Sequence, residues 1–146
     1  MEEAVEALMC AVDTGARVWT PFTESITVGI FRQRIKDAMA GRLEPVDHVK
    51  SLDRVLQSDL FEIRWQNVEV VERDLTGHQV AKRVHVRLIH CEPQTFPHAV
   101  VGLHAHEKVV FPGDNGRTRE AQQRDIGKAV AIYGDEARLR WAIYQL

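Results

Sequence analysis

Cysteine is scarce in this sequence, and long apolar runs are absent. The two cysteines, Cys10 and Cys91, are not clustered and form no metal-binding or redox motif, which fits a reducing environment. No apolar run is long enough to cross a bilayer, and the acidic beginning MEEAVEALMCAV lacks the basic segment of a signal peptide. We therefore expect a cytoplasmic protein that has no disulfide bonds and does not span a membrane.

An excess of positive charge is also missing. The chain has 21 acidic residues against 19 Lys and Arg, and its formal net charge is -2. This balance argues against a strongly basic nucleic-acid-binding protein, although it is compatible with a local basic face. What the chain does have is 146 residues, 45% of them hydrophobic and 27% charged, which is typical of one globular domain over residues 1–146 with a sizeable core.

Three stretches alternate apolar and polar side chains, which is the pattern of half-buried strands. They are Leu60–Trp65, Lys82–His90 and Ala99–Val109. The segment 66–80 carries the turn signal Thr76-Gly77-His78 and is predicted to be a hairpin extension or an excursion from the sheet.

Segments on both sides of these strands in the sequence have apolar residues at helical spacing. The predicted helices cover residues 2–12, a segment that starts at Thr20-Pro21 and ends at Gly41, a segment from Glu44 through Gln57, and residues 118–133 and 136–146, with a break at Gly134-Asp135. Helices segregated from strands predict an α+β fold, in which an antiparallel meander lies between N-terminal and C-terminal helices.

If the strands pair with their apolar faces aligned, their polar faces meet as well. The apolar face would hold Phe61, Ile63, Val84, Val86, Leu88, Val101 and Leu103, packed against Phe31, Ile35 and Met39 of the second helix. The polar face would gather Arg64, Arg83, His85, Arg87, His104, His106 and Lys108, with Glu62 as the acidic exception. Imidazole titrates near neutral pH, so this second face is where we expect chemistry.

Three motifs, in this order, resemble HigB-type toxins of the RelE/ParE superfamily. LFEIRW at 60–65 is similar to the family's Leu-(Phe/Trp)-Glu-(Ile/Leu)-Arg strand, residues 83–89 to the next strand, and LHAHEK at 103–108 to its Leu-His-Gly-Phe-x-Lys strand. The resemblance spans residues 30–133 and leaves 134–146 as a helical extension. It implies a RelE-like domain with helices on one face of the sheet, and a type II toxin that cuts mRNA on the ribosome and is neutralised by an antitoxin. The matching positions are Glu62, Arg64, Arg83, His104 and Lys108.

Cleavage of RNA through the 2′-hydroxyl needs a base, an acid and a group that stabilises the charged phosphorane. Imidazoles can perform both proton transfers, and arginines can hold the phosphate. The candidate catalytic residues are His104, His106, Arg64 and Arg83, and the candidate substrate-binding residues are His85, Arg87 and Lys108. The function predicted on this basis is that of a metal-independent endoribonuclease.

Two departures from the family pattern favour a second hypothesis. His106 replaces the usual aromatic residue and Val109 replaces a second lysine, and phosphate contacts normally come from Lys and Arg. The alternative is a non-enzymatic protein-interaction module on the same fold, a degenerate and phage-encoded relative of such toxins. An ordinary polar sheet face without chemistry is a further alternative.

The His104-x-His106 pair has a metal-binding interpretation too, because alternate residues of a strand point their imidazoles the same way. The sequence offers no third ligand at cupin-like spacing, and Glu107 has the opposite parity. The sequence therefore predicts no metal and no cofactor.

Overall fold

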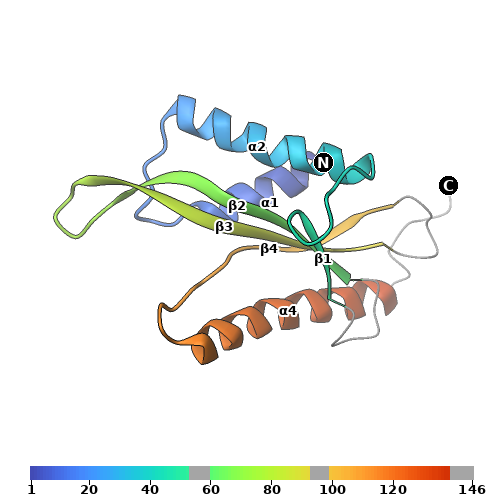
Figure 1. The fold of residues 1–146 in the computed structure, drawn as a ribbon. Coiled ribbons are helices and arrows are strands. Elements are labelled where there is room, and N and C mark those ends of the chain that lie inside the picture. The colour runs from blue at the N-terminus through green and yellow to red at the C-terminus, as the bar shows by residue number, and fades with distance from the viewer. Residues whose placement is uncertain (53–59, 93–98, 139–146) are drawn as a thin grey trace.

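The computed structural model describes residues 1–52, 60–92 and 99–138, which form three layers (Figure 1). The described helices are α1 (Glu2–Val12), α2 (Pro21–Met39) and α4 (Asn115–Arg138). The strands are β1 (Val49–Ser51), β2 (Leu60–Arg73), β3 (Gln79–Cys91) and β4 (Val101–Glu107), paired antiparallel in chain order. The predicted α+β fold with an antiparallel meander and helices at both ends is confirmed. Helices lie on both faces of the sheet, α1 and α2 on one and α4 on the other, whereas the family resemblance implies one covered face.

Helix α2 starts where local chemistry predicts. The Thr20 side chain accepts a hydrogen bond from the backbone N–H of Thr23, and Pro21 occupies the first turn, where its missing N–H costs nothing. The helix ends just before Gly41, which adopts the left-handed conformation (φ 66°) that favours glycine. Both boundaries confirm the prediction for this helix.

The main core lies between α1, α2 and the sheet. Phe31 of α2 meets Trp65 of β2 edge-to-face, with ring centroids 5.5 Å apart. Around this pair the core comprises Val5, Leu8, Val12, Ile35, Ile63, Val68, Val70, Val84, Val86 and Leu88. Met39 was expected to join this core but is 68% exposed, because Ala38, one residue earlier in the helix, faces the sheet instead.

A smaller core lies on the other face, under α4. It consists of Leu52, Leu60, Ile89, Cys91, Leu103, Ile126 and Ala129. Val101 and Leu103 were predicted to share a face with Ile63, and this is wrong. The pairing of β4 with β3 shifts between Ile89 and His90, so that one extra residue turns Val101 and Leu103 towards α4.

Of three other predictions, the hairpin extension is confirmed, whereas the helix from Glu44 and the helix break at Gly134 are wrong. The helix expected from Glu44 is wrong as far as Leu52: residues 45–48 form a bridge and a turn, and Val49–Ser51 form an edge strand that pairs with β2. Residues 53–57 of that predicted helix lie outside the described residues. The hairpin extension is confirmed, since β2 and β3 stay paired as far as Arg73 and Gln79. Helix α4 continues through Gly134 to Arg138, so the break expected there is wrong; a single glycine costs a helix only about 1 kcal/mol.

The predicted helix 136–146 lies mostly outside the described residues. In the part of the chain that is described, no helix has both the length and the apolar character needed to cross a bilayer.

Candidate functional site

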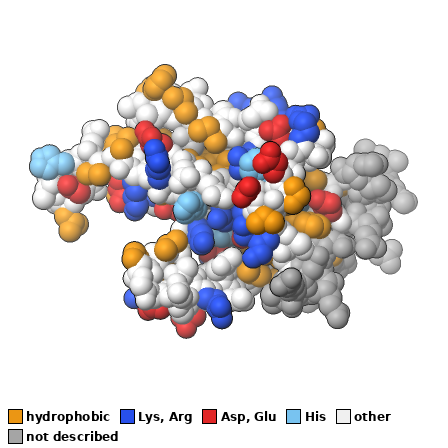
Figure 2. Space-filling model, in the orientation of Figure 1, with side chains coloured by type: hydrophobic (Ala, Val, Ile, Leu, Met, Phe, Trp, Pro, Cys, Tyr) orange, Lys and Arg blue, Asp and Glu red, His pale blue; other side chains and the backbone are white. Residues whose placement is uncertain are grey.

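The face of the sheet under α4 carries a charged cluster next to its small core, and Figure 2 shows Lys, Arg and His side chains gathered where the sheet and α4 meet. Arg64, Arg87 and His106 lie side by side on β2, β3 and β4, and in the next row Ile89 separates Glu62 from His104. Directly opposed residues of antiparallel strands project from the same face. The predicted gathering of these polar residues on one face is therefore present in the structure.

Glu62 is the buried centre of one half of this cluster. Its side chain is 1% exposed, and its Oε1 atom lies 3.0 Å from Nε of Arg64 and 3.4 Å from Nε of Arg87. Its second oxygen, Oε2, has no hydrogen-bond partner among the described residues. A carboxylate this deeply buried is tolerated only because the two guanidinium groups neutralise it.

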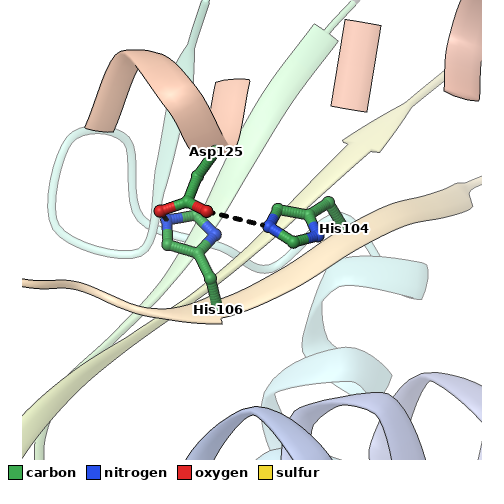
Figure 3. Close-up of side chains that lie close together, drawn as sticks. All are labelled: His104, His106 and Asp125. Atoms are coloured by element: carbon green, nitrogen blue, oxygen red, sulfur yellow. Dashed lines mark hydrogen bonds and ion pairs between the residues drawn. The ribbon is translucent and has the colours of Figure 1, made fainter. Parts of the chain in front are cut away.

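Asp125 completes the other half from α4 (Figure 3). Its Oδ1 lies 3.1 Å from Nε2 of His104, and its Oδ2 lies 3.9 Å from Nε2 of His106. The two imidazole rings are stacked, with centroids 5.2 Å apart and planes 12° from parallel. The Nζ of Lys128 donates to the same Oδ1 at 3.1 Å from the exposed side of α4. Two imidazoles and a carboxylate thus meet between the sheet and the helix.

Burial and hydrogen bonding act in different proportions on the pKa values of His106 and Asp125. Desolvation lowers the pKa of His106, and the nearby His104 and Arg87 act in the same direction, while Asp125 and Glu62 oppose it. Burial raises the pKa of Asp125, but hydrogen bonds from His104 and Lys128 outweigh it, so the pKa lies below its usual value. At neutral pH an ionised carboxylate therefore lies next to a neutral His106 imidazole.

Asp125 is the residue of the candidate site that the strand pattern missed, because it lies on α4, far along the chain from His104. A signal was present in the helical pattern. Ile126, Ala129 and Tyr133 are spaced to face the sheet, and Asp125 directly precedes the first of them. An acidic residue beside an apolar stripe indicates a polar contact at the edge of the packed face.

Two other predicted site residues, His85 and Lys108, lie at the border of the cluster. His85 is half-buried, and burial, together with the charges of Arg87 and Lys108, lowers its pKa. The backbone N–H of Lys108 donates to the carbonyl of His85 at 2.7 Å, which places the two residues next to each other. Both therefore border the cluster.

Arg83 is the predicted catalytic residue that the fold does not bring into the cluster. It is exposed and pairs in register with Glu69, beyond the bulge that interrupts β2 between Trp65 and Val68. It lies four positions before Arg87 on the same strand, or about 13 Å away at the usual rise per residue. The side chains of Arg83 and Arg87 project from the same face of the strand, but Arg83 lies too far along the hairpin to join the cluster.

Two hollows lie beside α4, near the cluster. The first is a cavity of about 10 Å³ whose lining includes Glu62, Arg87, His106, Lys108, Gln122 and Asp125. The second is an open groove of about 540 Å³ between β1 and α4, lined by residues that include Lys50, Arg119, Gln122 and Gln123. Because Gln122 borders both hollows, the polar groove leads up to the buried cluster.

No protein-family model, curated protein or solved structure matches this chain. The chemistry of the site is therefore argued from its own geometry. Two imidazoles, one carboxylate that orients them and a set of surrounding cations can perform general acid–base chemistry on an anionic substrate.

Proposed function

We propose that this protein is a metal-independent endoribonuclease, a cytoplasmic toxin of a type II toxin–antitoxin system that cuts mRNA on the ribosome. One observation carries the proposal: Asp125 orients His104 at 3.1 Å, with His106 stacked beside it and Arg87 in the next strand position. This is a set of proton-transfer groups in a positive environment. The resemblance of residues 60–65 and 103–108 to HigB-type strands supports the same function.

The two imidazoles fit the two proton transfers. His106, which burial keeps neutral, is suited to take the proton from the 2′-hydroxyl. His104, whose Nε2 lies next to the Asp125 carboxylate, is suited to protonate the leaving 5′-oxygen, because the contact with the carboxylate fixes the orientation of its ring.

Arg64 and Arg87 are directed at Glu62, so they supply positive potential from within the cluster. Lys108 lines the small cavity, and the exposed Lys128 is paired with Asp125, which lines the same cavity, so both amines are available to a phosphate bound there.

Helix α4 must move for this reaction to occur. His106 is only 8% exposed, and the adjoining cavity of about 10 Å³ is far too small for a nucleotide. The connection from β4 to α4 contains Pro112-Gly113, with Gly113 in the left-handed region (φ 78°), and α4 packs on the smaller of the two cores. Binding of an RNA strand would open this sheet–helix interface from the side of the groove.

Inducible expression in a bacterium tests the proposal directly. The wild-type chain should arrest growth and leave cleaved mRNA, and His104→Gln should slow cleavage by about 10²–10⁴-fold, the usual contribution of a general acid or base. His78→Gln is the matched control, because His78 lies at the exposed β2–β3 turn and should leave cleavage unchanged. Growth and mRNA untouched by the wild-type chain, or full toxicity of His104→Gln, would refute the nuclease function.

A non-enzymatic interaction module is the second candidate, favoured by the outer face of α2. Phe22, Ile26 and Ile30 follow one another at four-residue spacing and are 73%, 47% and 44% exposed. Residues at this spacing form a stripe on one side of a helix, of the kind that docks into a partner's groove. Figure 2 shows hydrophobic side chains gathered over α2 on the side away from the sheet.

The antitoxin of the first proposal, or another protein, would bind this stripe. The chain should then co-purify with the product of a neighbouring gene, and the double variant Phe22→Ser, Ile26→Ser should lose that partner. Co-purification without any mRNA cleavage by the wild-type chain would establish the interaction module in place of the nuclease. Retention of the partner by the double variant would exclude this surface.

A further inference from the structure

We propose that His104, His106 and Asp125 form a binding site for a single divalent transition-metal ion, of which Zn²⁺ fits the ligands best. Each residue offers one ligand atom, and all of these atoms lie within 4.8 Å of one another. Imidazole nitrogens with one carboxylate oxygen are a ligand set typical of Zn²⁺, whereas Mg²⁺ and Ca²⁺ prefer oxygen ligands alone. The sequence had argued against a metal for want of a third ligand, and α4 supplies that ligand.

The three side chains are already close to a ligating arrangement. Ligands of a tetrahedral Zn²⁺ at 2.0–2.1 Å lie roughly 3.3 Å from one another. The distance from Nε2 of His104 to Oδ1 of Asp125 is 3.1 Å, and that from Nε2 of His106 to Oδ2 is 3.9 Å. The widest separation in the set must shorten by roughly 1.5 Å, which side-chain rotation of the two imidazoles on β4 can supply.

A second observation points to a bound species at this place. The Oε2 atom of Glu62 is buried without a hydrogen-bond partner among the described residues, in a side chain that is 1% exposed. Glu62, His106 and Asp125 line the same cavity of about 10 Å³, which is the size of one water molecule. A water molecule held by the metal would donate a hydrogen bond to Oε2 and satisfy the buried oxygen.

The positively charged side chains around the site weaken its affinity for a metal ion. The amine of Lys128 lies 3.1 Å from Oδ1 of Asp125 and competes with a metal for that oxygen. Its side chain is 61% exposed, so it can withdraw into water when the metal binds. Arg87 lies directly opposite His106 and opposes a divalent charge, but Glu62, with which Arg64 and Arg87 are paired, offsets part of that opposition. Removal of Lys128 should therefore strengthen metal binding.

Binding of the metal would also regulate the enzyme, an inference that rests on the proposed nuclease function. An imidazole that donates its Nε2 lone pair to Zn²⁺ can no longer transfer a proton at that atom. The ion would in addition tie α4 to the sheet, because His104 and His106 lie on β4 and Asp125 lies on α4. Zn²⁺ should thus inhibit mRNA cleavage, and a chelator should restore it.

Titration of the untagged, chelator-treated protein with Co²⁺ tests the site without any substrate. We expect one ion per chain, seen as the visible absorption of tetrahedral or five-coordinate Co²⁺, and a matching Zn²⁺ stoichiometry by calorimetry. Asp125→Asn and His106→Gln should weaken binding by roughly tenfold or more, the scale on which perturbed metal shells lose affinity. Lys128→Ala should tighten it, and His78→Gln, at the exposed hairpin turn, should not change it.

Two outcomes would overturn the site: no Co²⁺ absorption at millimolar metal, or binding that Asp125→Asn and His106→Gln leave intact, which would place the ion elsewhere. Lys128→Ala changes only an exposed side chain, so it keeps the test decisive if the other variants fail to fold. Because absorption and calorimetry need no RNA, a metal-binding protein without nuclease activity would refute the proposed function alone. A nuclease that binds no metal would refute this inference alone.

Discussion

The two faces of the sheet are covered by helices in different ways. Under α1 and α2 lies one continuous apolar core built around Phe31 and Trp65. Under α4 the apolar contacts around Ile89 and Ile126 occupy only part of the face, and buried charges fill the remainder. Apolar burial stabilises, whereas buried charges cost free energy unless they are paired. We infer that the first face holds the fold together and that the second is free to carry chemistry.

The largest loss of stability is expected from a substitution in the core under α1 and α2. Trp65→Ala removes a side chain that is 1% exposed and packed edge-to-face on Phe31, so it should lower the free energy of unfolding by about 3–5 kcal/mol. Urea unfolding followed by circular dichroism measures this. Phe22→Ala, on the exposed side of α2, is the control and should stay within about 0.5 kcal/mol. A similar loss in both variants would contradict the assignment of the core to this face.

A smaller effect is expected from breaking the charge pairing on the second face. Among the described residues, Arg87→Ala leaves the buried Glu62 paired with Arg64 alone, so we expect a loss of about 3 kcal/mol, the lower end for broken buried ion pairs. The same urea titration applies. Arg83→Ala, on the same strand but exposed, should change stability by less than about 0.5 kcal/mol. Equal effects of the two substitutions would mean that the cluster contributes nothing to the fold.

The smallest expected effect is the pH dependence of stability that His106, on the face under α4, gives to the protein. Burial lowers the pKa of His106 below its ordinary value of 6.5, so the unfolded chain takes up a proton at a higher pH than the folded chain does. The stability that this neutral imidazole contributes is complete above pH 6.5 and is lost as the pH falls below it. His90, also buried with a lowered pKa, acts in the same direction.

Urea midpoints measured from pH 7.5 down to pH 5 should therefore fall, and His106→Gln should make the decline less steep. Trp65→Ala serves as the comparison variant, because it should lower every midpoint without changing the steepness. An unchanged slope in His106→Gln would show that this imidazole is not buried as the structure has it.

The local parts of the fold followed from the sequence because their causes are local. Alternation put Ile63 and Trp65, and likewise Val84 and Val86, on one face, and a Thr-Pro start with a glycine stop delimited α2. The same alternation placed Arg64, Arg87 and His106 together. These outcomes depend on periods of two and 3.6 residues, which are set by backbone geometry within each element.

What only the tertiary structure decided is where the elements meet. The extra residue in β4 reverses Leu103, and the docking of α4 brings Asp125 to His104. Each depends on contacts between segments far apart in the chain, and no periodic pattern records such contacts. The sequence by itself determined which side chains share a strand face; the packing of α4 on that face decided which of them meet a carboxylate.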